Sequence, residues 1–177
     1  MKERIEAVVG VLVGAPLVRI NRAASLAMFG FGRLLDGTSF RGEPRTYPEH
    51  SLHVEYAWRF VGSDGLVAVG SRDIWYPSGD PSNEPDDWQW DAPGANRFDE
   101  KSDELLRAED VMVVQSVLGS NAGDLTIRFN GSQSLELIID NSLPCEQWRF
   151  FSGQGGHLVV TPIGFEEDAP SIKSADH

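Results

Sequence analysis

The segment SLHVEYAWRFVG, residues 51–62, alternates apolar and polar side chains, and it constrains the fold more than any other part of the chain. Alternation with a period of two predicts a strand with one buried face and one wetter face. The GSDG turn at 62–65 and the apolar residues 66–76 predict that a second strand returns beside the first as a hairpin.

Other segments predict further strands. Residues 26–35 place phenylalanines between glycines and favour a strand, whereas residues 36–50 are rich in Gly, Pro and charge and predict a loop. Asn130-Gly131 is a strong hairpin signal between two apolar segments. The strands expected in the second half of the chain are 111–118, 124–129, 134–140, 146–151 and 157–163.

Two helices are expected. An apolar face with helical spacing predicts a helix near the N-terminus, formed by Ile5, Val8, Val9, Leu12 and Val13. This apolar run is too short, and too interrupted by glycine and proline, to span a membrane. After a long connection over 77–104, a short helix is expected near 102–109, with Ser102 or Asp103 at its N-cap.

These elements predict an α+β fold, because short turns join successive strands and two helices cannot cover both faces of a sheet. We expect a curved antiparallel sheet of about seven strands with the N-terminal helix packed on it. Residues 1–165 are expected to form a single domain, and residues 166–177 a polar, frayed tail.

The composition limits the cellular compartment and the binding partners that we expect. Cys145 is the one cysteine, and no secretory signal is evident, so we expect a cytoplasmic protein without a disulfide. The net charge is −12, and residues 51–110 hold five basic and fourteen acidic residues, for −9. Such a surface repels phosphate backbones, so we expect no nucleic-acid binding, and a basic protein is the favoured partner. Solubility alone is the other explanation of this charge.

The stretch GDPSNEPDDWQWDAPG, residues 79–94, crowds carboxylates around two tryptophans. The indoles could bury against the sheet and fix the loop, or form an exposed aromatic anchor ringed by carboxylates, as in a protein-interface hot spot. Both could hold at once. The expected binding residues are Trp75, Tyr76, Asp80, Asp86, Asp87, Trp88, Trp90 and Asp91.

No strong signal for a metal, a cofactor or catalysis is present. The acidic stretch matches an EF-hand poorly, because Pro85 stands where glycine is required and Asp91 where a bidentate Glu is expected. We therefore expect no cofactor and no dedicated metal site, although a loose carboxylate site for Ca²⁺ or Mg²⁺ stays open. Phosphate-loop and nucleophile-elbow motifs are also absent.

The polar face of the 51–60 strand is an alternative site for a small ligand or for acid–base chemistry, with Glu55 orienting an imidazole. Cross-strand charge pairing is the simpler interpretation. The residues concerned are His53, Glu55, Arg59 and Arg72.

Three longer segments carry a resemblance: LHVEYAWRFVGSDGLVAVGSRDIWYPSGDP, DDWQWDAPGANRFDE and LTIRFNGSQSLELIIDNSLPCEQWRFF. They resemble a group of bacterial proteins with no assigned activity, from the first helix to about residue 151, so the resemblance implies no catalytic residue. The last segment also resembles small immunity proteins that neutralise secreted toxins, which implies a protein-binding role.

Three hypotheses follow. The first is a non-enzymatic interaction module whose acidic, Trp-containing loop binds a basic protein such as a toxin. The second is a ligand binder or enzyme that uses the polar face around His53. The third is a homodimeric structural domain, joined by strand edges or helix faces.

Overall fold

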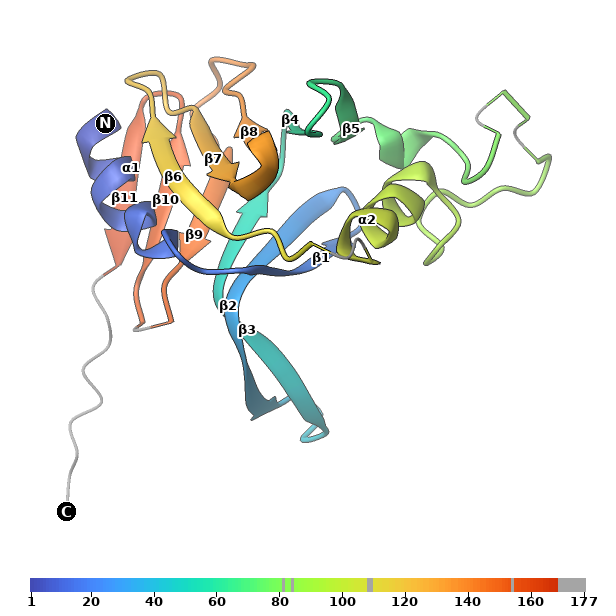
Figure 1. The fold of residues 1–177 in the computed structure, drawn as a ribbon, viewed down its shortest axis with the longest axis horizontal. Coiled ribbons are helices and arrows are strands. Elements are labelled where there is room, and N and C mark those ends of the chain that lie inside the picture. The colour runs from blue at the N-terminus through green and yellow to red at the C-terminus, as the bar shows by residue number, and fades with distance from the viewer. Residues whose placement is uncertain (81, 84, 108–109, 154, 169–177) are drawn as a thin grey trace.

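The computed structural model describes residues 1–177 except 81, 84, 108–109, 154 and 169–177. In the described part, two antiparallel sheets of six and five strands share one hydrophobic core, with a helix at each end (Figure 1). The predicted α+β class is confirmed. The strands form two sheets instead of one sheet of about seven strands.

The six-stranded sheet joins strands from both ends of the chain. Its order is β1 (Leu17–Ala23), β2 (Leu26–Thr38), β3 (Pro44–Val54), β9 (Trp148–Phe151), β10 (His157–Thr161) and β11 (Gly164–Asp168). The five-stranded sheet has the order β5 (Val67–Gly70), β4 (Trp58–Val61), β8 (Ser134–Leu137), β7 (Leu125–Phe129) and β6 (Val114–Gly119). Every pair of neighbouring strands is antiparallel.

The alternating segment 51–62 is divided between the two sheets. β3 ends at Val54 and β4 begins at Trp58, so residues 55–57 cross from one sheet to the other. Val54 and Trp58 are buried on either side of the crossing, whereas Tyr56 is 38% exposed. The alternation thus predicts burial in both strands and fails only at the crossing.

The long β2–β3 hairpin corrects the prediction of a loop over 36–50. Its outer half, residues 33–47, is an arm that projects from the body (Figure 1). Most side chains of the arm are exposed on both faces, and Phe40 at its tip is 93% exposed. A strand with no face to bury needs no apolar alternation, so the pattern is missing. Gly32, with a φ of +82°, allows the irregularity in pairing between Phe31 and Leu34.

The N-terminal helix α1 (Lys2–Val9) continues into the 3-10 helix η1 (Gly10–Leu12) and packs mainly against β6. Ile5, Val9 and Leu12 are fully buried, which confirms the predicted apolar face, but Val13 lies beyond the helix and is 54% exposed. In the described part of the chain, no helix combines the length and apolar character needed to cross a membrane.

Several boundaries differ from prediction. β6 begins at Val114 instead of residue 111, β8 ends at Leu137 instead of residue 140, β9 begins at Trp148 instead of residue 146, and β10 ends at Thr161 instead of residue 163. The second helix, α2, spans Arg97–Arg107 rather than 102–109. The returning strand of the first hairpin stops at Gly70, and the 3-10 helix η2 (Asp73–Trp75) follows it. β11 continues to Asp168, within the segment expected to be frayed, whereas residues 169–177 lie outside the described part. The 3-10 helix η3 (Asn130–Ser132) forms the β7–β8 turn, at the predicted Asn-Gly.

Candidate functional site

The acidic loop, residues 77–96, leaves the body after η2 and returns at α2 (Figure 1). Its two ends are held together, because Arg97 N donates to Tyr76 O at 2.8 Å and Ser78 N donates to Ala95 O at 3.1 Å. Gly79 N also donates to the carboxylate of Glu100 on α2. A long loop with paired ends is a compact surface element.

The tryptophans of the loop support its conformation. Trp88 Nε1 donates to Ala95 O at 2.8 Å, and the ring is partly buried. Trp90 packs against the core, and its ring centroid lies 4.5 Å from that of Trp75. The carbonyl of Trp90 accepts a hydrogen bond of 2.7 Å from Asn96 Nδ2. Both loop indoles therefore contribute to holding the loop in place.

Trp75 and Tyr76 present the exposed aromatic surface. Trp75 lies in η2 and Tyr76 directly follows it, which corrects the expectation that they end a strand. Their exposed fractions are 50% and 48%. They lie at the base of the acidic loop, where Arg97 pairs with Asp73 across 3.6 Å.

The carboxylates of the loop point outward. Asp80, Asp86, Asp87 and Asp91 are all exposed. Asp80 accepts hydrogen bonds from the hydroxyl and the backbone N–H of Ser82, and these hold the pKa of its carboxyl below the usual range. Glu84 of the same stretch lies outside the described residues. The loop also forms an open hollow of about 410 Å³, whose lining includes Pro77, Asp87 and Trp88.

The alternative site is divided between the two sheets. His53 lies on β3, where its ring centroid is 4.8 Å from that of Phe151 and its partner in register is Arg149. Burial, and secondarily the charge of Arg149, lowers the pKa of the His53 imidazole. The carboxylate that counteracts this shift belongs to Glu146, rather than to Glu55 as the strand pattern predicted.

The other three members of this set also lie apart from His53. Arg59 is on β4 and forms an ion pair of 2.7 Å with Glu136 on β8. Glu55 is exposed in the crossing segment, and Arg72 is exposed at the start of η2. The structure therefore supports cross-strand charge pairing for Arg59 and does not bring the four residues into one site.

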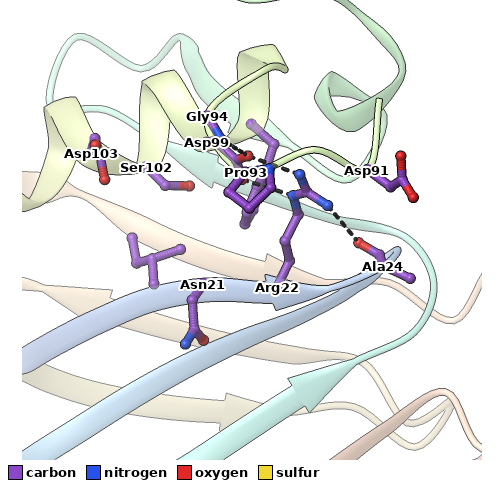
Figure 2. Close-up of a pocket in the computed structure, with 11 residues that line it drawn as sticks. Asn21, Arg22, Ala24, Asp91, Pro93, Gly94, Asp99, Ser102 and Asp103 are labelled. Carbon is purple, nitrogen blue, oxygen red and sulfur yellow. Dashed lines mark hydrogen bonds and ion pairs between the residues drawn. The ribbon is translucent and has the colours of Figure 1, made fainter. Parts of the chain in front are cut away.

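A second pocket, which the sequence did not predict, lies between β1 and α2 (Figure 2). Its volume is about 340 Å³. Arg22 and Asp99 form its wall through an ion pair, with Arg22 Nε 2.8 Å from Asp99 Oδ1 and Arg22 Nη2 2.9 Å from Asp99 Oδ2. Arg22 Nη2 also donates to the carbonyls of Trp90 and Ala92, which fixes the acidic loop to β1.

Ser102 also lines this pocket, and it is not the N-cap that the sequence suggested. α2 begins five residues earlier, and the Asn96 side chain caps it by accepting a hydrogen bond of 2.9 Å from Asp99 N. The pattern Asn96-Arg97-Phe98-Asp99 is a capping signal that could have located this helix start. Ser102 consequently lies within the helix, on its buried side, and is only 2% exposed.

No group of three or more His, Cys, Asp or Glu side chains in the described residues is arranged to hold a metal ion. The loose carboxylate site left open by the sequence therefore has no support in that part of the chain. Comparison of the chain with family models, curated proteins and solved structures finds no match.

Proposed function

We propose that this protein is a non-enzymatic binding module whose acidic loop recognises a basic protein. The observation that carries the proposal is that the loop has two kinds of side chain, indoles that support its conformation and carboxylates that face solvent. Trp90 packs against the core and Trp88 binds Ala95 O within the loop, while Asp86, Asp87 and Asp91 are exposed. A loop that is already ordered loses less conformational entropy when it binds, so more of the contact energy contributes to affinity.

The charge distribution favours a basic partner. Residues 51–110, which include the loop, carry a net charge of −9. A field of one sign steers an oppositely charged protein and accelerates association, and salt weakens this effect. Binding should therefore weaken as the ionic strength rises, mainly through a slower association rate. A basic toxin, as suggested by the resemblance to immunity proteins, is one concrete partner of this kind.

Two aromatic side chains at the base of the loop supply the apolar part of the interface. Trp75 and Tyr76 are each about half exposed, beside the outward carboxylates. Tryptophan and tyrosine are enriched among the residues that dominate binding energy, because each removes a large area from water and also carries a hydrogen-bond donor. We infer that they contact the partner directly, in contrast to Trp88.

The experiment is affinity capture followed by measurement with the purified captured protein. The loop variant carries Asp86→Asn, Asp87→Asn and Asp91→Asn. The matched control removes three exposed carboxylates elsewhere, through Glu3→Gln, Asp36→Asn and Glu166→Gln. Calorimetry at about 50 mM and 200 mM salt then measures the affinity of each variant, and circular dichroism checks that each is folded.

The expected result is a basic protein that binds the wild type and the control variant, is released by salt, and binds the loop variant at least about tenfold more weakly. Tyr76→Ala should weaken binding of the same partner without changing the salt dependence, because it removes apolar contact and no charge. Equal loss of affinity in the loop and control variants would reduce the effect to net charge and contradict the proposal.

A further inference from the structure

The pocket between β1 and α2 contains a polar atom with no protein partner. Ser102 Oγ is buried, and within the described residues it is the one buried side-chain nitrogen or oxygen without a hydrogen bond. Figure 2 shows Ser102 on the side of α2 that faces the pocket, with its hydroxyl turned toward Pro93 and Arg22 and away from Asp103. Proteins rarely leave such a group unpaired, so its presence in a pocket points to a ligand.

The charges around the pocket exclude an anionic ligand. Among the described residues that line the pocket, Arg22 is the one cation, and it is bound to Asp99 and to the carbonyls of Ala24, Trp90 and Ala92. Arg22 and Asp99 neutralise each other in a sheltered pair. The negative charge that remains in the lining is that of Asp91, which has no ion pair among the described residues, and part of that of Asp103, whose exposed pair with Arg107 is weak. The pocket therefore has a negative potential that only a cationic ligand complements.

The two remaining carboxylates lie at opposite sides of the pocket (Figure 2). Asp91 is exposed and has no ion pair within the described part of the chain. Asp103 pairs with Arg107 through Oδ2, in an exposed i,i+4 pair, and within the described residues its Oδ1 is left for another donor.

Apolar side chains line the space between these two carboxylates. Ile20 comes from β1, Phe98 from α2 and Pro93 from the acidic loop. A hydrocarbon chain between two cationic groups matches this order of acidic, apolar and acidic surface. The pocket volume of about 340 Å³ is at the small end of the range for ligand sites.

From this arrangement we propose that the pocket binds a linear aliphatic diamine, with one ammonium group at Asp91 and the other at Ser102. In this arrangement the second ammonium donates a hydrogen bond to Ser102 Oγ, which satisfies the buried hydroxyl. The methylene chain lies along Ile20, Phe98 and Pro93. This site does not depend on the protein partner proposed above, since either can exist without the other.

The test is an NMR titration of the full chain with 1,5-diaminopentane, compared with butylamine and with 1,5-pentanediol. The diamine should produce saturable shifts in the backbone amides of Asn21, Gly94, Asp99 and Ser102. The monoamine should bind about two- to fivefold more weakly, because it lacks one exposed ion pair. The diol should produce no saturable shift, since it cannot neutralise the carboxylates.

Three variants locate the site. Ser102→Ala should weaken diamine binding about tenfold, the usual effect of losing a hydrogen bond to a charged group, without lowering the melting temperature of the free protein. Asp91→Asn should also weaken binding, whereas Asp86→Asn changes an exposed carboxylate of the same loop outside the pocket and should not.

Several results would overturn the proposal: no saturable shift with the diamine, equal binding of diamine and diol, or unchanged affinity in Ser102→Ala. Equal affinities for the monoamine and the diamine would contradict the claim that both ammonium groups are bound. A lower melting temperature in Ser102→Ala would show that the hydroxyl supports the fold instead of a ligand. Because Ala is a better helix former than Ser, the substitution itself does not endanger α2.

Discussion

Arg22 on β1 and Asp99 on α2 form a two-pronged ion pair that is sheltered from solvent, with exposed side-chain fractions of 8% and 19%. The same guanidinium donates to two carbonyls of the acidic loop, those of Trp90 and Ala92. One side chain therefore joins the six-stranded sheet, the second helix and the loop of the candidate site.

Replacing Arg22 with Met should lower the free energy of unfolding by about 3 kcal/mol, because Asp99 would keep its charge in a sheltered position without a partner. Urea unfolding followed by tryptophan fluorescence measures the change. The matched control is Arg107→Met, which breaks an exposed i,i+4 pair with Asp103 and should cost no more than about 0.5 kcal/mol. Equal effects of the two substitutions would contradict the structural role of Arg22.

Trp88→Phe should loosen the acidic loop while leaving the fold intact. The substitution keeps an aromatic ring but removes the donor to Ala95 O, a loss of about 1 kcal/mol. Limited proteolysis should then cut within residues 78–95 faster than in the wild type. Tyr47→Phe is the control, since it removes an aromatic donor to Thr38 O in the arm, and its cleavage rate within the loop should stay near that of the wild type.

Asn96→Ala should destabilise the protein by about 2 kcal/mol. The fully buried Asn96 side chain caps α2 through Asp99 N and also donates to Trp90 O, so its loss removes two hydrogen bonds. Thermal unfolding measures the change. Asn83→Ala alters an exposed asparagine of the same loop and should leave the melting temperature unchanged. A similar melting temperature for both variants would show that the cap is dispensable.

Stability should fall as the pH drops below about 6.5, through the buried His50 and the partly buried His53. Burial lowers the pKa of the His50 imidazole, whose Nδ1 accepts a hydrogen bond of 3.2 Å from Gly153 N, and burial also lowers that of His53. The unfolded chain therefore takes up protons at a higher pH than the folded chain does. The stabilisation is complete above the unfolded pKa and is lost as the pH falls through the lower folded pKa.

Urea unfolding at pH 8.0, 6.5 and 5.5 tests this pH dependence. The free energy of unfolding should decline across the series in the wild type and decline less in His50→Gln, which cannot take up the proton. A wild type that is equally stable at all three values, or a variant with the wild-type slope, would rule out the role given to His50.

Shortening the arm should have little effect on the body. Replacing residues 37–45 with Asn-Gly would join Asp36 and Thr46, which already face each other in the hairpin, through a favourable two-residue turn. Because the removed residues are exposed on both faces, the free energy of unfolding should change by less than about 1 kcal/mol. A larger loss would show that the tip around Phe40 packs against the rest of the protein.

The local sequence pattern predicted a helix or a strand where buried side chains recur with a regular period. The alternation over 51–62 and the apolar spacing of the first helix both identified buried side chains, because each element has one face in the core. β1 was missed for a physical reason. Its pairing with β2 is irregular between Leu17 and Arg19, so Leu17 and Ile20 are buried three positions apart instead of two.

The candidate site was predictable only in part. The composition of the acidic loop identified the segment, but the sequence could not divide its aromatic residues into supporting ones, such as Trp88, and exposed ones, such as Tyr76. That division depends on tertiary contacts of the loop, such as those of Arg22, which lies far away in the chain and binds the carbonyls of Trp90 and Ala92 only in the folded protein. The same holds for the pocket around Ser102, since β1 and α2 meet only through tertiary packing.

The pairing of β3 with β9 has a consequence for synthesis on the ribosome. Ser51 lies opposite Phe151 in the register of these strands, so the first three strands of the larger sheet are translated long before their neighbours. Until residues 148–151 emerge, β3 carries an open edge that can pair with another nascent chain. The interval between these two strands is therefore the period in which the growing polypeptide is most exposed to aggregation and to chaperone binding.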